Sequence, residues 1–248
     1  MSDAATALAC LDLTDLSDDC TAGDVAALCA KATTPHGAVA AVCVWPRFVK
    51  HARAALPRDV AVATVVNFPY GADRVAPVVA ETEQALADGA DEIDLVLPYR
   101  AFAEGRADVA AKMLDAVRVA TGPKLMKVIL ETGMLHEPGV IRRAADLAVA
   151  EGADFLKTST GKVATGATPE AARVMLDAIA ASGARVGLKV SGGVRTLEDA
   201  ETYLALAREA MGADWPRPRT FRIGASALLT ALLAALDGAA APNPAEGY

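Results

Sequence analysis

The sequence has 248 residues, of which 53% are hydrophobic, and its formal net charge is -7 at pH 7. Together with a pI of about 5.0 and a mean hydropathy of +0.29, this length predicts one large apolar core. The acidic balance excludes a general nucleic-acid-binding surface, so we expect no nucleic-acid partner and basic residues that act locally on a small anionic ligand.

Eight short apolar segments have the length and residue types of buried strands. In chain order they are Leu11–Leu13, Ala40–Val44, Val60–Val66, Glu92–Leu97, Lys124–Leu130, Phe155–Thr158, Arg185–Val190 and Thr220–Ile223. Amphipathic helical patterns lie between most of them, at Asp24–Ala32, Val75–Asp88, Asp108–Thr121, Val140–Glu151, Pro169–Ala181 and Leu197–Met211. This alternation predicts a parallel sheet, and eight such strands predict a single α/β domain, a closed (β/α)₈ TIM barrel.

Local signals support the helix boundaries. Thr21 with Asp24, and Thr196 with Asp199, have the spacing of capping boxes, and Thr168 precedes a first-turn proline. Glycines are placed to end helices before the next strand, at Gly89, Gly152, Gly183 and Gly212. We expect residues 1–238 to form the barrel and residues 239–248, which are small and interrupted by prolines, to form a flexible tail.

Other sequence features exclude several classes of protein. The longest apolar run, Ile223–Leu236, is too short to span a bilayer, and the first residues lack the pattern of a signal peptide. We therefore expect no membrane association and a cytoplasmic location. The four cysteines form no CxxC pair and share no metal-ligand spacing with the three histidines. Reduced thiols, no metal and no cofactor are expected.

Charged residues interrupt four of the predicted strands, at Asp94, Lys127, Lys157 and Lys189. Burial disfavours the charged form of lysine, so such a residue becomes a nucleophilic amine that forms a Schiff base with a carbonyl. A second cation would lower its pKa further, and a carboxylate could transfer protons. The competing interpretation is that one or two of these charges form structural ion pairs inside the barrel.

Two glycine-containing loops have the sequence expected of a phosphate site. Ser191–Arg195 follows the seventh predicted strand, and Gly224–Ser226 follows the eighth. Backbone N–H groups in such loops bind anions, and these two positions commonly hold phosphate in barrels of this type. Gly161 and Lys162, after the sixth strand, could add an N–H group and a cation.

The motifs Asp94–Arg100, Lys127–Thr132, Phe155–Lys162 and Lys189–Arg195 are similar in residues and order to those of the deoxyribose-phosphate aldolases, from about Leu11 to the end of the chain. The resemblance implies that Lys157 is the Schiff-base nucleophile, Lys189 the lysine that lowers its pKa, and Asp94 the acid and base. It also implies substrate and phosphate contacts from Asp12, Thr14, Thr160, Gly161, Lys162, Gly192, Gly193, Val194, Arg195, Gly224, Ala225 and Ser226.

Four other positions are less clearly defined. Ala227 stands where the family often has a second hydroxyl residue. The loss of that hydroxyl would weaken phosphate affinity slightly. Asn67 fits a supporting role. Tyr248 matches the terminal tyrosine of some members, which assists proton transfer, or is an arbitrary last residue. Cys43 is interpreted as a buried small apolar residue; if it faced the cavity, unsaturated aldehydes would alkylate it.

The predicted function is a metal-independent class I aldolase, an aldehyde-lyase of nucleoside catabolism. It would cleave 2-deoxy-D-ribose 5-phosphate reversibly to D-glyceraldehyde 3-phosphate and acetaldehyde, with only small phosphosugars and aldehydes, and a second copy of the chain, as partners. Two alternatives stay open. One is another lysine-dependent barrel enzyme, such as a transaldolase or a fructose-phosphate aldolase; the other is a catalytically silent phosphosugar-binding barrel, which would not need the strand lysines.

Overall fold

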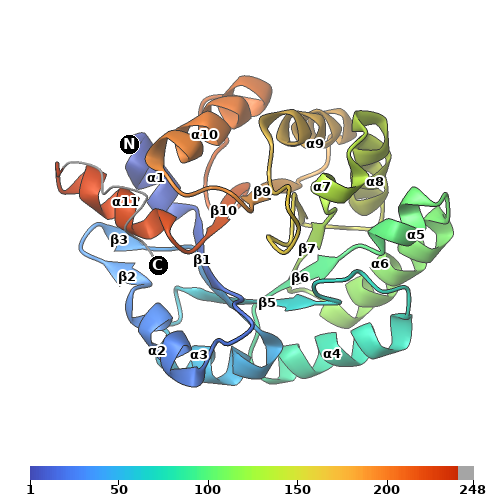
Figure 1. Cartoon of the computed structure of the whole chain (residues 1–248), viewed down its shortest axis with the longest axis horizontal. Coiled ribbons are helices and arrows are strands. Elements are labelled where there is room, and N and C mark those ends of the chain that lie inside the picture. Colours follow the sequence, from blue (N-terminus) through green and yellow to red (C-terminus); the bar gives the residue numbers. More distant parts are fainter. Residues whose placement is uncertain (240–248) are drawn as a thin grey trace.

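The computed structural model describes residues 1–239 and contains a closed barrel of eight parallel strands surrounded by helices (Figure 1). The predicted TIM barrel is therefore confirmed. Its barrel strands are β1 Leu11–Asp15, β4 Ala41–Val44, β5 Ala61–Val66, β6 Glu92–Val96, β7 Leu125–Ile129, β8 Phe155–Lys157, β9 Gly187–Ser191 and β10 Phe221–Ala225. The barrel closes where β1 pairs with both β4 and β10. Most of the predicted tail, with Tyr248, lies outside the described residues.

Helices surround the barrel; the first precedes β1, the last follows β10, and the others lie between successive strands (Figure 1). They are α1 Asp3–Ala9, α2 Ala22–Ala30, α3 Val49–Ala55, α4 Val75–Ala87, α5 Tyr99–Ala103, α6 Ala107–Thr121, α7 Thr132–Leu135, α8 Pro138–Ala150, α9 Pro169–Ser182, α10 Leu197–Met211 and α11 Leu228–Leu236. A short 3₁₀ helix, Pro46–Phe48, precedes α3, and a hairpin of β2 Thr33–Thr34 and β3 Gly37–Ala38 follows α2.

The core lies mainly between the strands and the helix layer. One face of each strand packs against apolar helix residues such as Met113, Leu176 and Leu204, all fully buried. Residues of the opposite face point into the barrel, because side chains alternate along a strand. The interior is partly apolar, with Cys43 and Ala63 in a small separate cluster, and partly charged.

The sequence-based boundaries differ from the observed ones by at most two residues for every predicted strand and helix. Both capping boxes form, because the Thr21 and Thr196 side chains each accept the N–H of an aspartate three residues later. Thr168 caps α9 in the same way. The local signals therefore correctly fixed where these helices begin.

The strand register decides which charged residues meet inside the barrel. Asp94 on β6 lies opposite Lys127 on β7, and Lys157 on β8 lies opposite Lys189 on β9. In the pairing of β7 with β8, Phe155 lies opposite Lys127. Lys157 comes two residues after Phe155 and therefore lies two residues nearer the carboxyl ends of the strands than Lys127 does. All four side chains consequently point into the same half of the barrel, at two heights.

Candidate active site

The Asp94 carboxylate is the centre of a buried cluster of three lysines. Lys127 donates to its Oδ1 at 2.7 Å, and Lys157 and Lys189 each donate to its Oδ2 at 2.8 Å. Asp94 is fully buried, and none of the three lysines is more than 2% exposed. The four charged residues that interrupt the predicted strands therefore meet at one point, as the sequence led us to expect.

Three further charged residues extend this cluster toward the bottom of the barrel. Glu92 pairs with Lys127 at 2.6 Å, and Asp12 pairs with Lys189 at 2.6 Å. Arg222 joins the two carboxylates, with 2.6 Å to Asp12 and 2.8 Å to Glu92. The register explains this arrangement, because Arg222 on β10 lies opposite Lys189 on β9.

The charges of this hydrogen-bonded cluster are unequal if every group is ionised. Four cationic side chains, Lys127, Lys157, Lys189 and Arg222, face three carboxylates, those of Asp12, Glu92 and Asp94. An uncompensated charge in a buried site is costly, and the group shifts its pKa instead. A cluster with one neutral lysine is balanced.

Lys157 is the lysine best suited to be neutral. Burial lowers the pKa of Lys157, and the Lys189 cation lowers it further, although the Asp94 carboxylate acts in the opposite direction. Burial acts on Lys189 in the same way, but its two carboxylate neighbours, Asp12 and Asp94, outweigh it and raise the pKa of Lys189. The Asp94 and Glu92 carboxylates likewise raise the pKa of Lys127 against the effect of burial.

The pKa of Asp94 is held well below its ordinary value. Burial alone would raise it, but the three surrounding lysines stabilise the carboxylate. Asp94 therefore accepts hydrogen bonds from Lys189 and Lys157 as a carboxylate. The arrangement connects Lys189, whose pKa is raised, to Lys157, whose pKa is lowered, through a single carboxylate.

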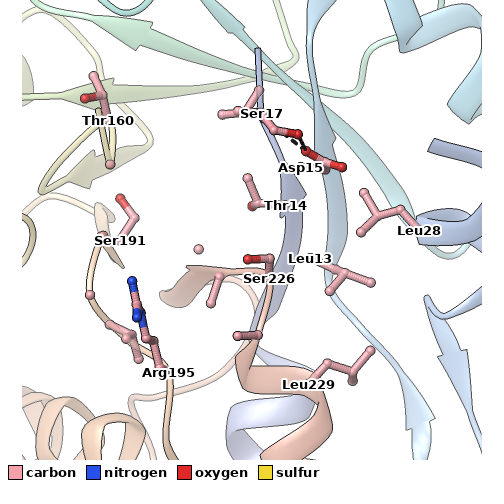
Figure 2. Close-up of a pocket in the computed structure, with 18 of the residues that line it drawn as sticks. Leu13, Thr14, Asp15, Ser17, Leu28, Thr160, Ser191, Arg195, Ser226 and Leu229 are labelled. Atoms are coloured by element: carbon pink, nitrogen blue, oxygen red, sulfur yellow. Dashed lines mark hydrogen bonds between the residues drawn. The ribbon is translucent and has the colours of Figure 1, made fainter. Parts of the chain in front are cut away.

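A cavity of about 680 Å³ opens above this cluster at the carboxyl ends of the strands. Lys157 lines it, whereas Asp94, Lys127 and Lys189 lie beneath its floor. Figure 2 shows Thr160, Ser191 and Arg195 on one side of the cavity, and Ser226, Thr14, Asp15 and Ser17 on the other. A carbonyl compound that enters the cavity therefore meets Lys157 before it meets another lysine of the cluster.

The backbone conformation at one end of the cavity suits the binding of an anion. Gly192 and Gly193 have φ of 83° and 93°, which L side chains rarely adopt, and both line the cavity beside Arg195. At Gly224 the reason for glycine is space, because a Cβ would lie 2.9 Å from Lys189 Cε and 3.0 Å from Ser191 Cβ. Free N–H groups and a guanidinium together suit a phosphate.

Most of the predicted binding residues line this cavity. They are Thr14, Thr160, Gly161, Lys162, Gly192, Gly193, Val194, Arg195, Gly224, Ala225 and Ser226. Lys162 points its amine toward the rim, where it pairs with Asp18 at 2.7 Å and lies 5.8 Å from the centre of the Trp45 ring.

Asp12 does not lie where the substrate contact was predicted. Its carboxylate is fully buried between Lys189 and Arg222 and does not line the cavity. The reason is strand position: Asp12 is the second residue of β1, whereas Thr14, two residues further along, reaches the cavity. The structure thus places Asp12 within the charge cluster, and its contact with the substrate stays a prediction.

Three other predicted residues have different outcomes. Cys43 is fully buried and does not line the cavity, which confirms its interpretation as a small buried residue. Asn67 holds the turn after β5, where its side chain exchanges hydrogen bonds with the Ala72 backbone. Tyr248 lies outside the described residues.

The sequence did not identify several residues of this site. The cavity is also lined by Leu13, Asp15, Leu16 and Ser17 from the end of β1, by Asp24, Ala27, Leu28 and Lys31 from α2 and its C-cap, and by Leu229 and Thr230 from α11. Glu131, fully buried, hydrogen-bonds Thr160. Glu131 directly follows a predicted strand, and a charged residue in that position indicates a place near the site. The lining residues on helices have no such indication in the sequence.

Among residues 1–239, no group of three or more His, Cys, Asp or Glu side chains is arranged to hold a metal ion. Within the same range, no helix is both long and apolar enough to cross a membrane. All four cysteines are buried and unpaired. Burial raises the pKa of Cys10 to about 12 and also raises that of Cys43.

Comparison with known proteins gives the site its context. Residues 6–234 match the model of the DeoC/LacD family of aldolases. A deoxyribose-phosphate aldolase from Agrobacterium fabrum is 54% identical over 99% of this chain and 96% of that protein.

Solved structures agree. A Toxoplasma gondii ME49 protein provisionally assigned as a deoxyribose-phosphate aldolase has a TM-score of 0.86 at 30% identity, over 95% of this chain and 96% of that one. A tetrameric deoxyribose phosphate aldolase from Aeropyrum pernix has a TM-score of 0.73 at 25% identity, over 95% of this chain and 92% of that one. The chain therefore belongs to the DeoC/LacD family of aldolases, and its resemblance to the deoxyribose-phosphate aldolases is confirmed.

Proposed function

We propose that this aldolase reversibly cleaves 2-deoxy-D-ribose 5-phosphate to D-glyceraldehyde 3-phosphate and acetaldehyde through a Schiff base on Lys157. One observation carries the proposal. Lys157 lines the cavity, its pKa is lowered, and its amine lies 2.8 Å from the carboxylate of Asp94. A neutral amine in this position attacks an aldehyde without a metal ion.

The geometry gives each step a group. Lys157 Nζ adds to the aldehyde carbon of the open-chain sugar to give a carbinolamine. Asp94 and Lys189, hydrogen-bonded to each other at 2.8 Å, transfer the protons needed as water leaves. The iminium then accepts the electron pair of the C2–C3 bond, and D-glyceraldehyde 3-phosphate departs when the 3-hydroxyl loses its proton. Protonation of the enamine and hydrolysis release acetaldehyde and restore Lys157.

The phosphate would bind at the end of the cavity remote from Lys157. The backbone of Gly161, Gly192, Gly193 and Gly224 lines this region with Arg195 and Ser226. Binding energy from this remote group holds the reacting carbon over the nucleophile. Because Ala227 follows Ser226, one hydroxyl contact common in the family is absent from this part of the chain.

A direct assay tests the proposal against its alternatives. The purified chain, with a chelator present, is expected to cleave 2-deoxy-D-ribose 5-phosphate, and Lys157→Met is expected to have no measurable activity. Fructose 1,6-bisphosphate should be cleaved at least about a hundredfold less efficiently, because the pocket must exclude a larger donor. Efficient cleavage of the ketose phosphate would favour a fructose-phosphate aldolase, and binding without any cleavage would favour a silent barrel.

Other predictions remain proposals of the same kind. We infer a homo-oligomer, with a dimer as the simplest state, supported by the tetrameric relative from Aeropyrum pernix; light scattering on the purified chain measures it. A cytoplasmic location fits the four unpaired cysteines. Tyr248 remains a candidate for enamine protonation, and Tyr248→Phe should then slow hydrogen exchange at the acetaldehyde methyl group.

A further inference from the structure

Glu131 is a buried carboxylate that the proposed reaction does not use. It follows β7 by two positions and has no exposed surface. Within residues 1–239 it forms no ion pair, although burying an unpaired carboxylate is costly. Its backbone is also in the left-handed region, with φ of 57° and ψ of 58°, which glutamate rarely adopts. Two unfavourable features at one residue point to a role.

The partner of this carboxylate is a single cavity residue. Glu131 Oε2 accepts a hydrogen bond from the Thr160 hydroxyl at 2.5 Å, and Oε1 accepts one from the Thr160 backbone N–H at 3.2 Å. The same hydroxyl oxygen accepts the N–H of Lys162 at 3.0 Å. The side chain of Glu131 therefore fixes Thr160 at both its backbone and its hydroxyl, and Thr160 in turn fixes the turn through Gly161 to Lys162.

The loop that Glu131 holds extends across to the glycines of the anion-binding end. Ala167 N–H donates to the carbonyls of Ser191 and Gly192 at 3.1 and 2.9 Å. At Gly166 the approach is too close for a side chain, because a Cβ would lie 2.3 Å from Gly192 O. The segment Thr160–Thr168 is thus held by Glu131 at one end and packed against Gly192 at the other.

We propose that Glu131 is a positioning residue for phosphate binding: it holds Thr160, and through it the Gly161–Lys162 turn, in the conformation that receives the phosphate. The proposal rests on the proposed function, since it assigns the phosphate to this end of the cavity. Glu131 acts on the bound phosphate through Thr160 and does not itself line the cavity. Its removal should therefore weaken binding of the phosphorylated substrate far more than it affects the reaction of Lys157 with a substrate that has no phosphate.

Paired substrates separate this role from a general structural one. For Glu131→Gln, which keeps the shape but replaces one acceptor oxygen by a donor, we expect KM for 2-deoxy-D-ribose 5-phosphate to rise about tenfold, the effect of one charge-assisted hydrogen bond. The kcat/KM for unphosphorylated 2-deoxy-D-ribose should change less than about threefold. Glu201→Gln, at an exposed position on α10, is the matched control for loss of the same charge.

A second pair of variants tests the route through Thr160. Thr160→Val removes the hydroxyl and should raise KM for the phosphorylated substrate in the same way. For the double variant Glu131→Gln with Thr160→Val, KM for the phosphorylated substrate should exceed that of either single variant by no more than about twofold, because both substitutions remove the same interaction. Additive losses would contradict the proposed coupling.

A trapping experiment with acetaldehyde gives outcomes that would contradict the proposal. At a pH above the midpoint of the Lys157 titration, borohydride trapping of acetaldehyde on Glu131→Gln should keep the rate of the wild type, since acetaldehyde has no phosphate. A trapping rate that falls as much as KM for the phosphorylated sugar rises, or equal losses with the two sugars, would overturn the proposal and make Glu131 part of the reaction chemistry. If the wild-type chain neither cleaves the phosphorylated sugar nor traps acetaldehyde, the proposed function has failed, whatever Glu131 does.

Discussion

At the scale of single residues, the site depends on opposing effects on one amine. Lys189 and Asp94 both lie next to Lys157, but the cation lowers its pKa and the carboxylate raises it. The two neighbours can therefore be distinguished by the direction in which their removal shifts the ionisation of Lys157, and not only by loss of rate.

For Lys189→Met we expect the acid limb of the kcat/KM profile to move to higher pH. Removing the neighbouring cation removes a cause of the lowered pKa, so Lys157 stays protonated over a wider range. The rate should also fall about 10²–10⁴-fold, because the proton donor to Asp94 is lost. An unchanged midpoint, measured across a pH series, would mean that Lys189 does not set the ionisation of Lys157.

Asp94→Asn should shift the same midpoint the other way. Without the carboxylate that favours the ammonium form, the pKa of Lys157 falls and the acid limb moves to lower pH. The kcat should nevertheless decrease about 10²–10⁴-fold, since asparagine cannot transfer the protons. A variant that retains kcat would show that another group carries the proton.

The residue scale is also where prediction from sequence reached its limits. Lys157, Lys189 and Asp94 could be recognised because a charge inside an apolar strand needs an explanation. The place of Asp12 could not, because two residues along β1 separate the charge cluster from the cavity, and only the barrel register shows that difference. The helix-borne lining residues Leu28 and Lys31 lie in an ordinary amphipathic pattern.

At the scale of elements, the loops after β8 and β9 form one unit. The contact between Gly166 and Gly192 leaves no room for a Cβ, and the neighbouring N–H of Ala167 bonds two carbonyls of the β9 end. Separation of these loops should affect the anion-binding end before it affects Lys157.

Gly166→Ala tests this coupling. A methyl group 2.3 Å from Gly192 O forces the loops apart, and we expect KM for 2-deoxy-D-ribose 5-phosphate to rise by about tenfold or more, since small displacements of binding groups are costly. Gly139→Ala on α8 is the matched control, because its nearest neighbour would be the end of the Arg143 side chain at 3.8 Å. Equal KM values for the two variants would contradict the proposed rigidity.

Long helices and the barrel strands were predictable, whereas the shortest helices and the two-residue strands were not. Helices such as α10, with a capping box and fifteen residues, have their own signals. The helices α5 and α7 have five and four residues, and the strands β2 and β3 have two each, too few for a recognisable period. The helices α5 and α7 lie where the chain returns from β6 and β7 to the helix layer, and the hairpin of β2 and β3 lies between α2 and β4.

At the scale of the whole molecule, the charge cluster joins strands on opposite sides of the barrel. Asp12 on β1, Glu92 on β6, Lys127 on β7 and Arg222 on β10 are linked by ion pairs of 2.6–2.8 Å, apart from the longer Lys127–Asp12 contact of 3.8 Å. Stability of the fold should therefore depend on the ionisation of these groups.

The expected sign follows from the carboxylates. The pKa values of Asp12 and Asp94 are both lowered in the folded chain, because the effect of the surrounding cations outweighs that of burial. Their contribution to stability is complete above the ordinary value of 3.8 and is lost as pH falls toward the lower folded values. The free energy of unfolding, from denaturant titrations between about pH 2 and 7, should decrease steeply below about pH 4.

Asp12→Asn provides the comparison for that measurement. The variant should be less stable at pH 7 by about 3–5 kcal/mol, since Lys189 and Arg222 lose a buried partner. Its stability should also depend less on pH below about pH 4 than that of the wild type. Parallel curves for the two proteins would show that Asp12 is not a source of acid sensitivity.

The most direct test of the central claim is to reduce the chain with borohydride in the presence of acetaldehyde and a chelator, then to map the modified peptide by mass spectrometry. We predict a single reduced adduct on Lys157, formed faster as pH rises through the lowered pKa of its amine. An adduct on Lys189 would contradict the assignment of the two lysines. If no adduct forms, and the chain cleaves 2-deoxy-D-ribose 5-phosphate only when the chelator is absent, the Schiff-base mechanism itself is contradicted.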